Sequence, residues 1–207
     1  MSLREKIIES SLKLFSEKGF HGVSVQDLVE HSATSKGGFY HHFSSKDELL
    51  YVIHDKFISY VLKEGHLAKK KYERPMMQMH EILKSFVRVF DLYNEHIVVF
   101  YQENKYLKDE YEKIIKTKRD EYKQIVNDVI QEGQAHGDFR EKLPPTITTM
   151  PILGMVNWTY KWYRKDGEKS IDQIAAVYID LLMHGLLTDH ALHEYQASEL
   201  YKELQYE

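Results

Sequence analysis

The sequence predicts an all-α protein in which a small N-terminal unit of three helices precedes a larger helical domain. Apolar residues recur at intervals of three and four along most of the 207-residue chain, whereas alternation with a period of two is almost absent. The chain holds only 4 Pro and 10 Gly, so long loops are scarce. We therefore expect about nine or ten helices, in domains at residues 1–61 and 62–207.

The first three helices are expected before residue 43. The first spans residues 3 to 18, and Gly19 follows it as is usual at a helix C-terminus. Ser24 can cap the second helix, with Asp27 three residues later in the place of the usual Glu or Gln. Thr34 or Ser35 can cap a third, short helix, which gives a helix-turn-helix at about residues 24–43.

The larger domain consists of longer helices. The fourth helix begins with KDELL, which places acidic residues in the first turn, and its apolar periodicity continues to about residue 71. Pro75 marks a break after it. Further helices are expected at about residues 76–93, 96–106, 107–136, 145–164, 171–189 and 191–205.

The composition excludes several classes of protein. The chain has no Cys, which excludes disulfides, thiolate nucleophiles and cysteine-based metal sites. The N-terminus lacks the apolar segment of a signal peptide, and the longest apolar run, residues 97–101, is too short to cross a bilayer. We expect a cytoplasmic protein with no membrane partner.

An enzyme is the main rival class, because 12 His could form metal or acid–base sites. The pairs His190/His193, His190/Glu194 and Asp180/His184 have helical spacing, but none forms H-E-x-x-H and no third ligand is evident. The chain also lacks G-x-S-x-G, G-x-G-x-x-G and P-loop motifs. We expect no catalytic activity, no metal and no cofactor.

The stretch VEHSATSKGGFYHHFSSKDELL, residues 29–50, has the chemistry of a DNA-binding surface. The chain has a net charge of −4, and its first 50 residues carry 6 basic and 7 acidic side chains, so positive groups must act locally. In a helix-turn-helix the second helix enters the major groove, and its N-terminal residues approach base edges. We expect Phe39 and Phe43 to hold this helix on the other two. The predicted DNA-binding residues are Ser24, Thr34, Ser35, Lys36, Gly37, Gly38, Tyr40, His41, His42 and Lys46.

The two glycines of this helix need a reason. Gly37 and Gly38 each cost roughly 1 kcal/mol of helix stability relative to Ala. That cost is explained if side chains at these positions would block close approach to the duplex. The rival interpretation is a plain turn with solvated histidines.

At this point the sequence resembles a known family. Residues 3–52 contain F-x-x-K-G-F, V-x-D-L, S-K-G-x-F-Y-H-H-F and S-K-D-E-L in the order and spacing found in TetR/AcrR transcriptional regulators. The resemblance implies a homodimer that binds palindromic operator DNA, usually as a repressor, and is released by a small effector. Gly38 departs from the family, which often has Thr, Ser or Ala there, so one base-reading side chain is missing.

The C-terminal domain is rich in aromatic residues, with 15 Tyr, 9 Phe and 2 Trp in the whole chain. These residues either form an ordinary core or line an apolar effector cavity. A Trp pair near Asn157, Lys161 and Arg164 would suit a ligand with an apolar body and an anionic head. The predicted effector-binding residues are Phe57, Phe86, Phe90, Tyr93, Phe100, Tyr101, Tyr122, Asn157, Trp158 and Trp162.

Residues 154–186 resemble regulators of fatty-acid and lipid metabolism, which implies a long-chain acyl-CoA or fatty acid as effector. One alternative is a repressor of an efflux pump that responds to drug-like ligands. Another is a non-catalytic helical protein-interaction domain, which would leave residues 34–46 unexplained.

A second apolar stripe on residues 171–189 predicts a dimer interface, because one stripe must pack inward and the other faces solvent. In the family, the equivalent helices pair across a two-fold axis. The predicted interface residues are Ile174, Tyr178, Leu181, Leu182, Gly185 and Leu186. The long fourth helix, which begins at Lys46, is expected to join the DNA and effector sites through the region of Phe57 and Tyr60.

Overall fold

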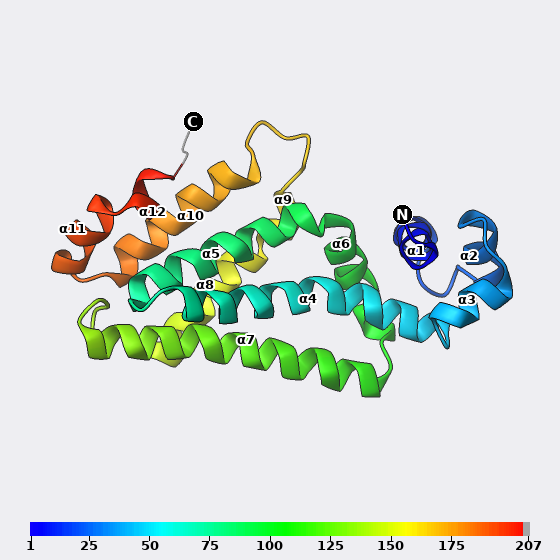
Figure 1. Cartoon of the computed structure of the whole chain (residues 1–207), viewed down its shortest axis with the longest axis horizontal. Helices are drawn as coiled ribbons and strands as arrows, with labels where there is room; N and C mark the ends of the chain where they lie inside the picture. Colours follow the sequence, from blue (N-terminus) through cyan, green and yellow to red (C-terminus); the bar gives the residue numbers. More distant parts are fainter. Residues whose placement is uncertain (205–207) are drawn as a thin grey trace. The chain divides into compact units, whose positions relative to one another are not determined.

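The structure, a computed structural model, describes residues 1–204 and confirms the all-α class (Figure 1). Within those residues the backbone is mostly helical, with one isolated antiparallel bridge between Phe139 and Leu187. In chain order the helices are α1 (Leu3–Lys18), α2 (Val25–His31), α3 (Lys36–His42), α4 (Lys46–Lys71), α5 (Pro75–Leu92), α6 (Asn94–Glu103), the 3-10 turn η1 (Asn104–Tyr106), α7 (Asp109–His136), α8 (Pro145–Asn157), α9 (Thr159–Trp162), α10 (Ile171–Leu186), α11 (Asp189–Ala197) and α12 (Glu199–Lys202).

The chain divides into two compact units. Unit 1 contains Met1–Ser59 and Tyr93–Thr117, and unit 2 contains Tyr60–Leu92 and the chain from Lys118 onwards. Both units are therefore discontinuous in sequence. The helices α4 and α7 each contribute residues to both units.

Unit 1 is built around α1, which packs against α2, α3 and α6. The capping box predicted at Ser24 is present: its hydroxyl accepts the Asp27 N–H, and the Asp27 carboxylate accepts the Ser24 N–H at 2.7 Å. Gly19 ends α1 with a φ of 71°, a left-handed value that favours glycine. The core of this unit includes Ile7, Phe15, Leu28, Phe39 and Phe43.

Unit 2 is organised by α5, whose apolar face packs along α10 and also contacts α9 and α11 (Figure 1). Met79, Ile82 and Leu83 on α5 are fully buried, as are Ile179 and Met183 on α10. Each Å² of apolar surface that this helix pair buries contributes about 25 cal/mol to stability.

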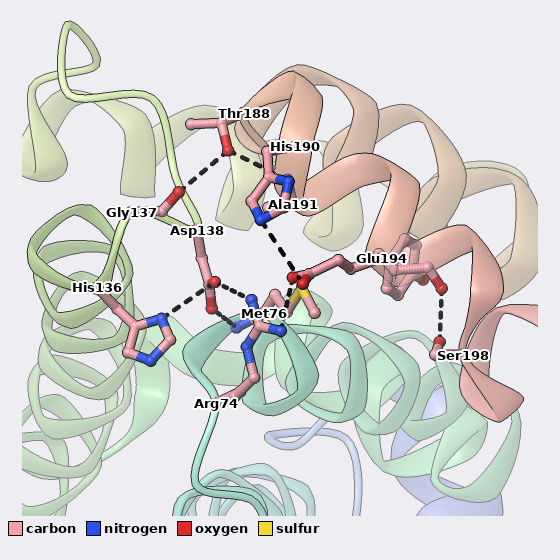
Figure 2. Close-up of polar contacts among 11 residues, drawn as sticks. Arg74, Met76, His136, Gly137, Asp138, Thr188, His190, Ala191, Glu194 and Ser198 are labelled. Carbon is pink, nitrogen blue, oxygen red and sulfur yellow. Dashed lines mark hydrogen bonds and ion pairs between the residues drawn. The ribbon is translucent and has the colours of Figure 1, made fainter.

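A buried carboxylate ties three connections of unit 2 together (Figure 2). Asp138, in the turn after α7, accepts hydrogen bonds from Arg74 Nη2 at 2.5 Å and from the Met76 N–H at 3.2 Å. His136 Nδ1 lies 3.2 Å from the same carboxylate, and Arg74 also reaches Glu194 on α11 at 2.7 Å. The start of α5, the end of α7 and α11 are thus fixed to one another.

Two of the expected helices are interrupted. The helix expected at residues 145–164 ends at Asn157, and a single turn, α9, follows after Trp158. Tyr163 then becomes extended, and its hydroxyl donates to Asp91 on α5 at 2.7 Å. The helix expected at residues 191–205 is divided at Ser198, whose hydroxyl caps α12; residue 205 lies outside the described residues.

Candidate nucleic-acid interface and effector region

The helix α3 is held at its N-terminus by local hydrogen bonds. The Ser35 hydroxyl accepts the Gly38 N–H at 3.0 Å, which makes Ser35 the N-cap. The preceding turn is closed by the Thr34 N–H, which donates to the Val29 carbonyl at 3.0 Å. Ala33 adopts a φ of 50° in this turn, a conformation that non-glycine residues adopt only when their surroundings impose it.

The two faces of α3 differ as the sequence predicts. Phe39 and Phe43 are 0% and 1% exposed, and α3 packs on α1 and α2. On the other side Lys36 and His41 are exposed, and Tyr40 is 55% exposed. An apolar inner face is thus combined with a polar outer face that is available to a partner.

The two glycines of α3 have different surroundings. A Cβ at Gly37 would meet only the Ser35 hydroxyl, at 3.7 Å, so the position is open. A Cβ at Gly38 would lie 2.5 Å from Thr34 Oγ1. Packing within the chain therefore disfavours a side chain at Gly38, whereas no contact in the described chain disfavours one at Gly37.

Three further members of the predicted DNA-binding set lie at helix ends. Ser24 is exposed, but its hydroxyl is engaged in the α2 capping box, and its hydrogen bonds lower the pKa of the Asp27 carboxyl. Thr34 and His42 are half-buried at the two ends of α3.

Lys46, one of the predicted DNA-binding residues, already has partners within the chain. Its Nζ donates to the carbonyl oxygens of Phe20 and Val23, each at 2.6 Å, and lies 4.2 Å from the centre of the Phe20 ring. Partial burial lowers the pKa of this amine below its usual range. Backbone acceptors of the chain therefore already occupy much of its donor capacity.

Part of the predicted effector set forms an aromatic cluster in unit 1. The rings of Phe57 and Phe100 lie 5.1 Å apart, and Phe100 also contacts Tyr101 at 5.2 Å. The fully buried ring of His54 contacts Phe100 at 5.0 Å, and neither of its nitrogens has a hydrogen-bond partner in the described chain. Burial lowers the pKa of His54 to about 3, which keeps the ring neutral. Sequence patterns gave no sign of this histidine.

A second part of the set lies in unit 2. Phe86 contacts Phe90 at 6.3 Å and Tyr122 at 5.2 Å. The Tyr122 hydroxyl is buried without a hydrogen-bond partner in the described chain, and burial raises the pKa of this phenol. A buried polar group without a partner is costly, so this position favours a ligand or water that supplies one.

The remaining predicted effector residues lie outside both clusters. Asn157 is exposed, and Trp158 and Trp162 are 62% and 45% exposed. Tyr93 is half-buried beside His96, at 5.6 Å between ring centres. The Trp pair thus lies on the surface of unit 2 instead of lining a buried cavity.

The structure has a pocket of about 370 Å³ elsewhere in unit 2. Its lining comes from α5, α10 and the end of α12: Lys84, Arg88, Asp172, Ala175, Ala176, Ile179, Lys202, Glu203 and Leu204. None of the ten predicted effector residues belongs to it. Its charges are already matched in part, because Arg88 Nε lies 2.6 Å from Asp172.

Exposed apolar residues form a stripe on each of two helices in unit 2. Val177 and Leu181 on α10 are one turn apart and exposed, and Ile147 and Met150 have the same relation on α8. Gly185 continues the α10 stripe, and nothing lies within 4 Å of a Cβ at that position. Sequence reasoning omitted Ile147, Met150 and Val177 from the predicted interface.

Two of the predicted interface residues do not lie on the exposed stripe. Ile174 is 8% and Leu186 is 3% exposed, because both belong to the inward face of α10 that packs along α5. Tyr178 and Leu182 are half-buried at the edge of the stripe, while Leu181 is 60% exposed. Of the predicted interface set, Ile174 and Leu186 thus lie on the inward side of α10 and Leu181 on the outward side.

Comparison with known proteins places the chain in a family. A model described as "Bacterial regulatory proteins, tetR family" matches residues 7–52, and one described as "Tetracyclin repressor-like, C-terminal domain" matches residues 72–186. The chain belongs to the tetR family. The tetR-family match covers the helix-turn-helix described above and most of unit 2.

Several relatives resemble this tetR-family chain along most of its length. The repressor KstR2 of Mycolicibacterium smegmatis is 21% identical over 187 residues, which cover 89% of this chain and 91% of KstR2. The crystal structure of the TetR-family regulator PfmR from Thermus thermophilus shares 30% identity, covers 86% of this chain and 97% of PfmR, and has a TM-score of 0.79. The structure of AibR in complex with isovaleryl coenzyme A and operator DNA shares the fold at 21% identity, with coverage of 88% and 98% and a TM-score of 0.74.

These matches establish that the chain is a DNA-binding transcriptional regulator of the tetR family. No helix in residues 1–204 is long and apolar enough to span a membrane. In the same part of the chain, no group of three or more His, Asp or Glu side chains is arranged to hold a metal ion.

Proposed function

We propose that the chain is a repressor that binds palindromic operator DNA as a homodimer and is released by a small hydrophobic effector. The observation that carries the proposal is the two-sided α3 helix. Phe39 and Phe43 hold it on the core of unit 1, while Lys36, Tyr40 and His41 point away from that core. Helices of this kind enter the major groove, where such side chains meet phosphates and base edges.

The DNA contact is expected to depend on few charges. The chain carries a net charge of −4, so hydroxyl groups, backbone N–H groups and Lys36 must supply the attraction locally. We expect Lys36→Ala and Tyr40→Ala to weaken operator binding by about tenfold each. Fluorescence anisotropy with a duplex selected from random DNA measures this. A protein that selects no duplex at low salt would contradict the proposed function.

The proposed dimer uses the exposed stripes of α8 and α10. Exposed apolar patches on a helical surface favour burial against a partner. A two-fold dimer would also place two copies of α3 at successive major grooves, about 34–36 Å apart. Size-exclusion chromatography with light scattering tests the proposal, and a monomer at micromolar concentration would contradict it.

The proposed effector is a long acyl chain, carried as a fatty acid or as an acyl-CoA. The aromatic cluster of unit 2 supplies apolar surface, and the unpartnered Tyr122 hydroxyl supplies a buried polar group that such a ligand could satisfy. Two relatives support the coarser class of apolar and acyl-CoA ligands: KstR2 of Mycobacterium tuberculosis is described as a ketosteroid transcriptional regulator, and AibR was crystallised with isovaleryl coenzyme A. The predicted rings are closely packed, so a ligand must separate them to enter.

A thermal-shift panel tests the effector class. Acyl-CoAs and free fatty acids of several chain lengths are compared with drug-like cations and coenzyme A alone. Stabilisation by acyl compounds with a chain-length optimum is the expected result. Stabilisation by the drug-like compounds alone would instead favour a regulator of an efflux pump.

Release of DNA requires that the effector prefer a state that binds operator poorly. The long helix α4 carries residues of both units and is the proposed link between the sites. By linkage, operator DNA must then weaken effector binding by the same factor as effector weakens operator binding. Equal operator affinity with and without saturating effector would exclude this mechanism.

A further inference from the structure

The turn between α1 and α2, residues 19–23, is held from outside by two oppositely charged side chains. On one side Glu103, the last residue of α6, accepts the Phe20 N–H through Oε2 at 3.0 Å. On the other side Lys46, the first residue of α4, donates to the carbonyl oxygens of Phe20 and Val23, each at 2.6 Å. All of these residues belong to unit 1.

Burial raises the free-energy cost of losing these hydrogen bonds. Glu103 is a buried carboxylate, and Phe20 and Val23 are buried as well. A buried backbone N–H or C=O group that loses its hydrogen-bond partner destabilises the fold. The free-energy cost is similar in size to the stabilisation that a hydrogen bond to a charged group provides. The Phe20 N–H is therefore satisfied by the Glu103 side chain, while the Phe20 carbonyl accepts both the Lys46 amine and, at 3.4 Å, the Val23 N–H. Removal of Glu103 leaves the Phe20 N–H unpaired, and removal of the Lys46 amine takes away the donor to the Val23 carbonyl.

Ring packing and glycines fix the same turn. Tyr106, just after α6, stacks on Phe20 at 6.2 Å and contacts His21 at 4.2 Å between ring centres. Gly19 needs its positive φ of 71°, and a Cβ at Gly22 would run into the Lys18 carbonyl. These contacts restrict the backbone conformation of the turn, which is followed directly by Ser24, the N-cap of α2.

The position of α2 decides the position of α3, because the two helices pack on each other and are joined by a short turn. We infer that Lys46 and Glu103 are positioning residues: through the 19–23 turn they set the placement of the helix-turn-helix, and the Lys46 amine acts on the chain's own carbonyls instead of on a DNA phosphate. This inference rests on the proposed role of α3 in binding operator DNA.

The salt dependence of DNA binding separates the two roles of Lys46. Each phosphate contact contributes about 0.9 to the slope of log affinity against log salt concentration. Lys46→Met keeps the apolar stem and removes the amine, so we expect about tenfold weaker operator binding at every salt concentration with an unchanged slope. Lys36→Met is the matched control and is expected to reduce the slope. If Lys46→Met reduces the slope as Lys36→Met does, Lys46 is a phosphate ligand and the inference is wrong.

Glu103 is tested by a conservative pair of variants. Glu103→Gln retains an oxygen that can accept the Phe20 N–H, whereas Glu103→Leu does not. We expect Glu103→Leu to lose about tenfold in operator affinity and Glu103→Gln to recover most of that loss. Equal affinity for the two variants would overturn the role of the hydrogen bond. Far-UV circular dichroism and melting temperature identify any variant that has lost its fold.

A measurement without DNA keeps this inference separate from the proposed function. Hydrogen exchange, followed by mass spectrometry on peptides that cover residues 19–31, reports the stability of the turn and α2 directly. Both Lys46→Met and Glu103→Leu should accelerate exchange in these peptides, and Lys36→Met should not. Unchanged exchange in the first two variants would refute the positioning role even if the wild-type protein selected no duplex.

Discussion

Gly37 is the position at which helix stability and DNA binding are expected to oppose each other. It lies in the first turn of α3 and is exposed, and a Cβ there would meet only the Ser35 hydroxyl at 3.7 Å. The free protein thus accepts a methyl group at this position without rearrangement. Because Ala loses less backbone entropy on folding than Gly, Gly37→Ala should stabilise the free protein by roughly 0.5–1 kcal/mol. For a chain of this size that corresponds to a rise of about 1–4 °C in melting temperature.

The effect on DNA binding should have the opposite sign. If the backbone at Gly37 lies against the duplex, the added methyl group overpacks a close interface. Overpacking costs about 1–3 kcal/mol, or roughly 5- to 160-fold in affinity per chain. The variant should therefore be more stable and yet bind operator more weakly, a combination that general damage to the fold cannot produce.

Calorimetry and fluorescence anisotropy on the same preparations measure the two effects. Thr117→Ala, on the exposed face of α7, is the matched control, since it raises helix propensity outside the helix-turn-helix and should leave operator affinity unchanged. Gly38→Ala should instead destabilise the free protein, because its Cβ would lie 2.5 Å from Thr34 Oγ1. A more stable Gly37→Ala protein with wild-type operator affinity would refute the close approach at Gly37.

Three further predictions concern unit 2 and the buried histidine. Leu181→Glu places a charge on the exposed α10 stripe and should shift the protein toward monomer in light scattering, with little loss of helicity. His54 has a pKa lowered to about 3 by burial, while an unfolded His has a pKa near 6.5. The unfolded state therefore binds a proton at His54 before the folded state does, so the free energy of unfolding is unaffected above pH 6.5 and decreases as the pH falls toward 3. By pH 5 this decrease should reach about 2 kcal/mol in urea titrations. His54→Phe should make the free energy of unfolding less dependent on pH. Asp138→Ala leaves Arg74 and a backbone N–H without their buried acceptor and should cost about 2–3 kcal/mol in urea unfolding, whereas Glu194→Ala, which removes an exposed partner of Arg74, should change the unfolding midpoint far less.

Features set by neighbouring residues were predictable from the sequence. The second helix starts after Ser24 because its capping box is complete within four residues. The first helix ends before Gly19 because a left-handed residue terminates it. The burial of Phe39 and the exposure of Tyr40 follow from helical periodicity on a three-helix core.

Features set by distant residues were not predictable in this way. The break at Trp158 falls within continuous apolar periodicity, and the chain direction after it depends on the bond from Tyr163 to Asp91, which is 72 residues away in sequence. Lys46 is similar, since its acceptors at Phe20 and Val23 precede it by 26 and 23 residues. No local pattern contains such contacts.

Which side of α10 faces the core could not be predicted from the sequence, for a different reason. Apolar residues occur on most sides of this helix, so periodicity shows that it is helical without showing which side faces α5. Only the packing of Ile179 and Met183 into the core settles that Ile174 points inward and Leu181 outward.

The discontinuous make-up of unit 1 has a consequence for biosynthesis. Its N-terminal part emerges from the ribosome first, yet Glu103 and Tyr106, which hold the 19–23 turn, are synthesised more than 80 residues later. At a translation rate of about 5–20 residues per second, the three leading helices wait on the order of several seconds for these partners. During that interval the 19–23 turn lacks its contacts with Glu103 and Tyr106, so we expect the recognition surface of the nascent chain to be completed only after α6 has been synthesised.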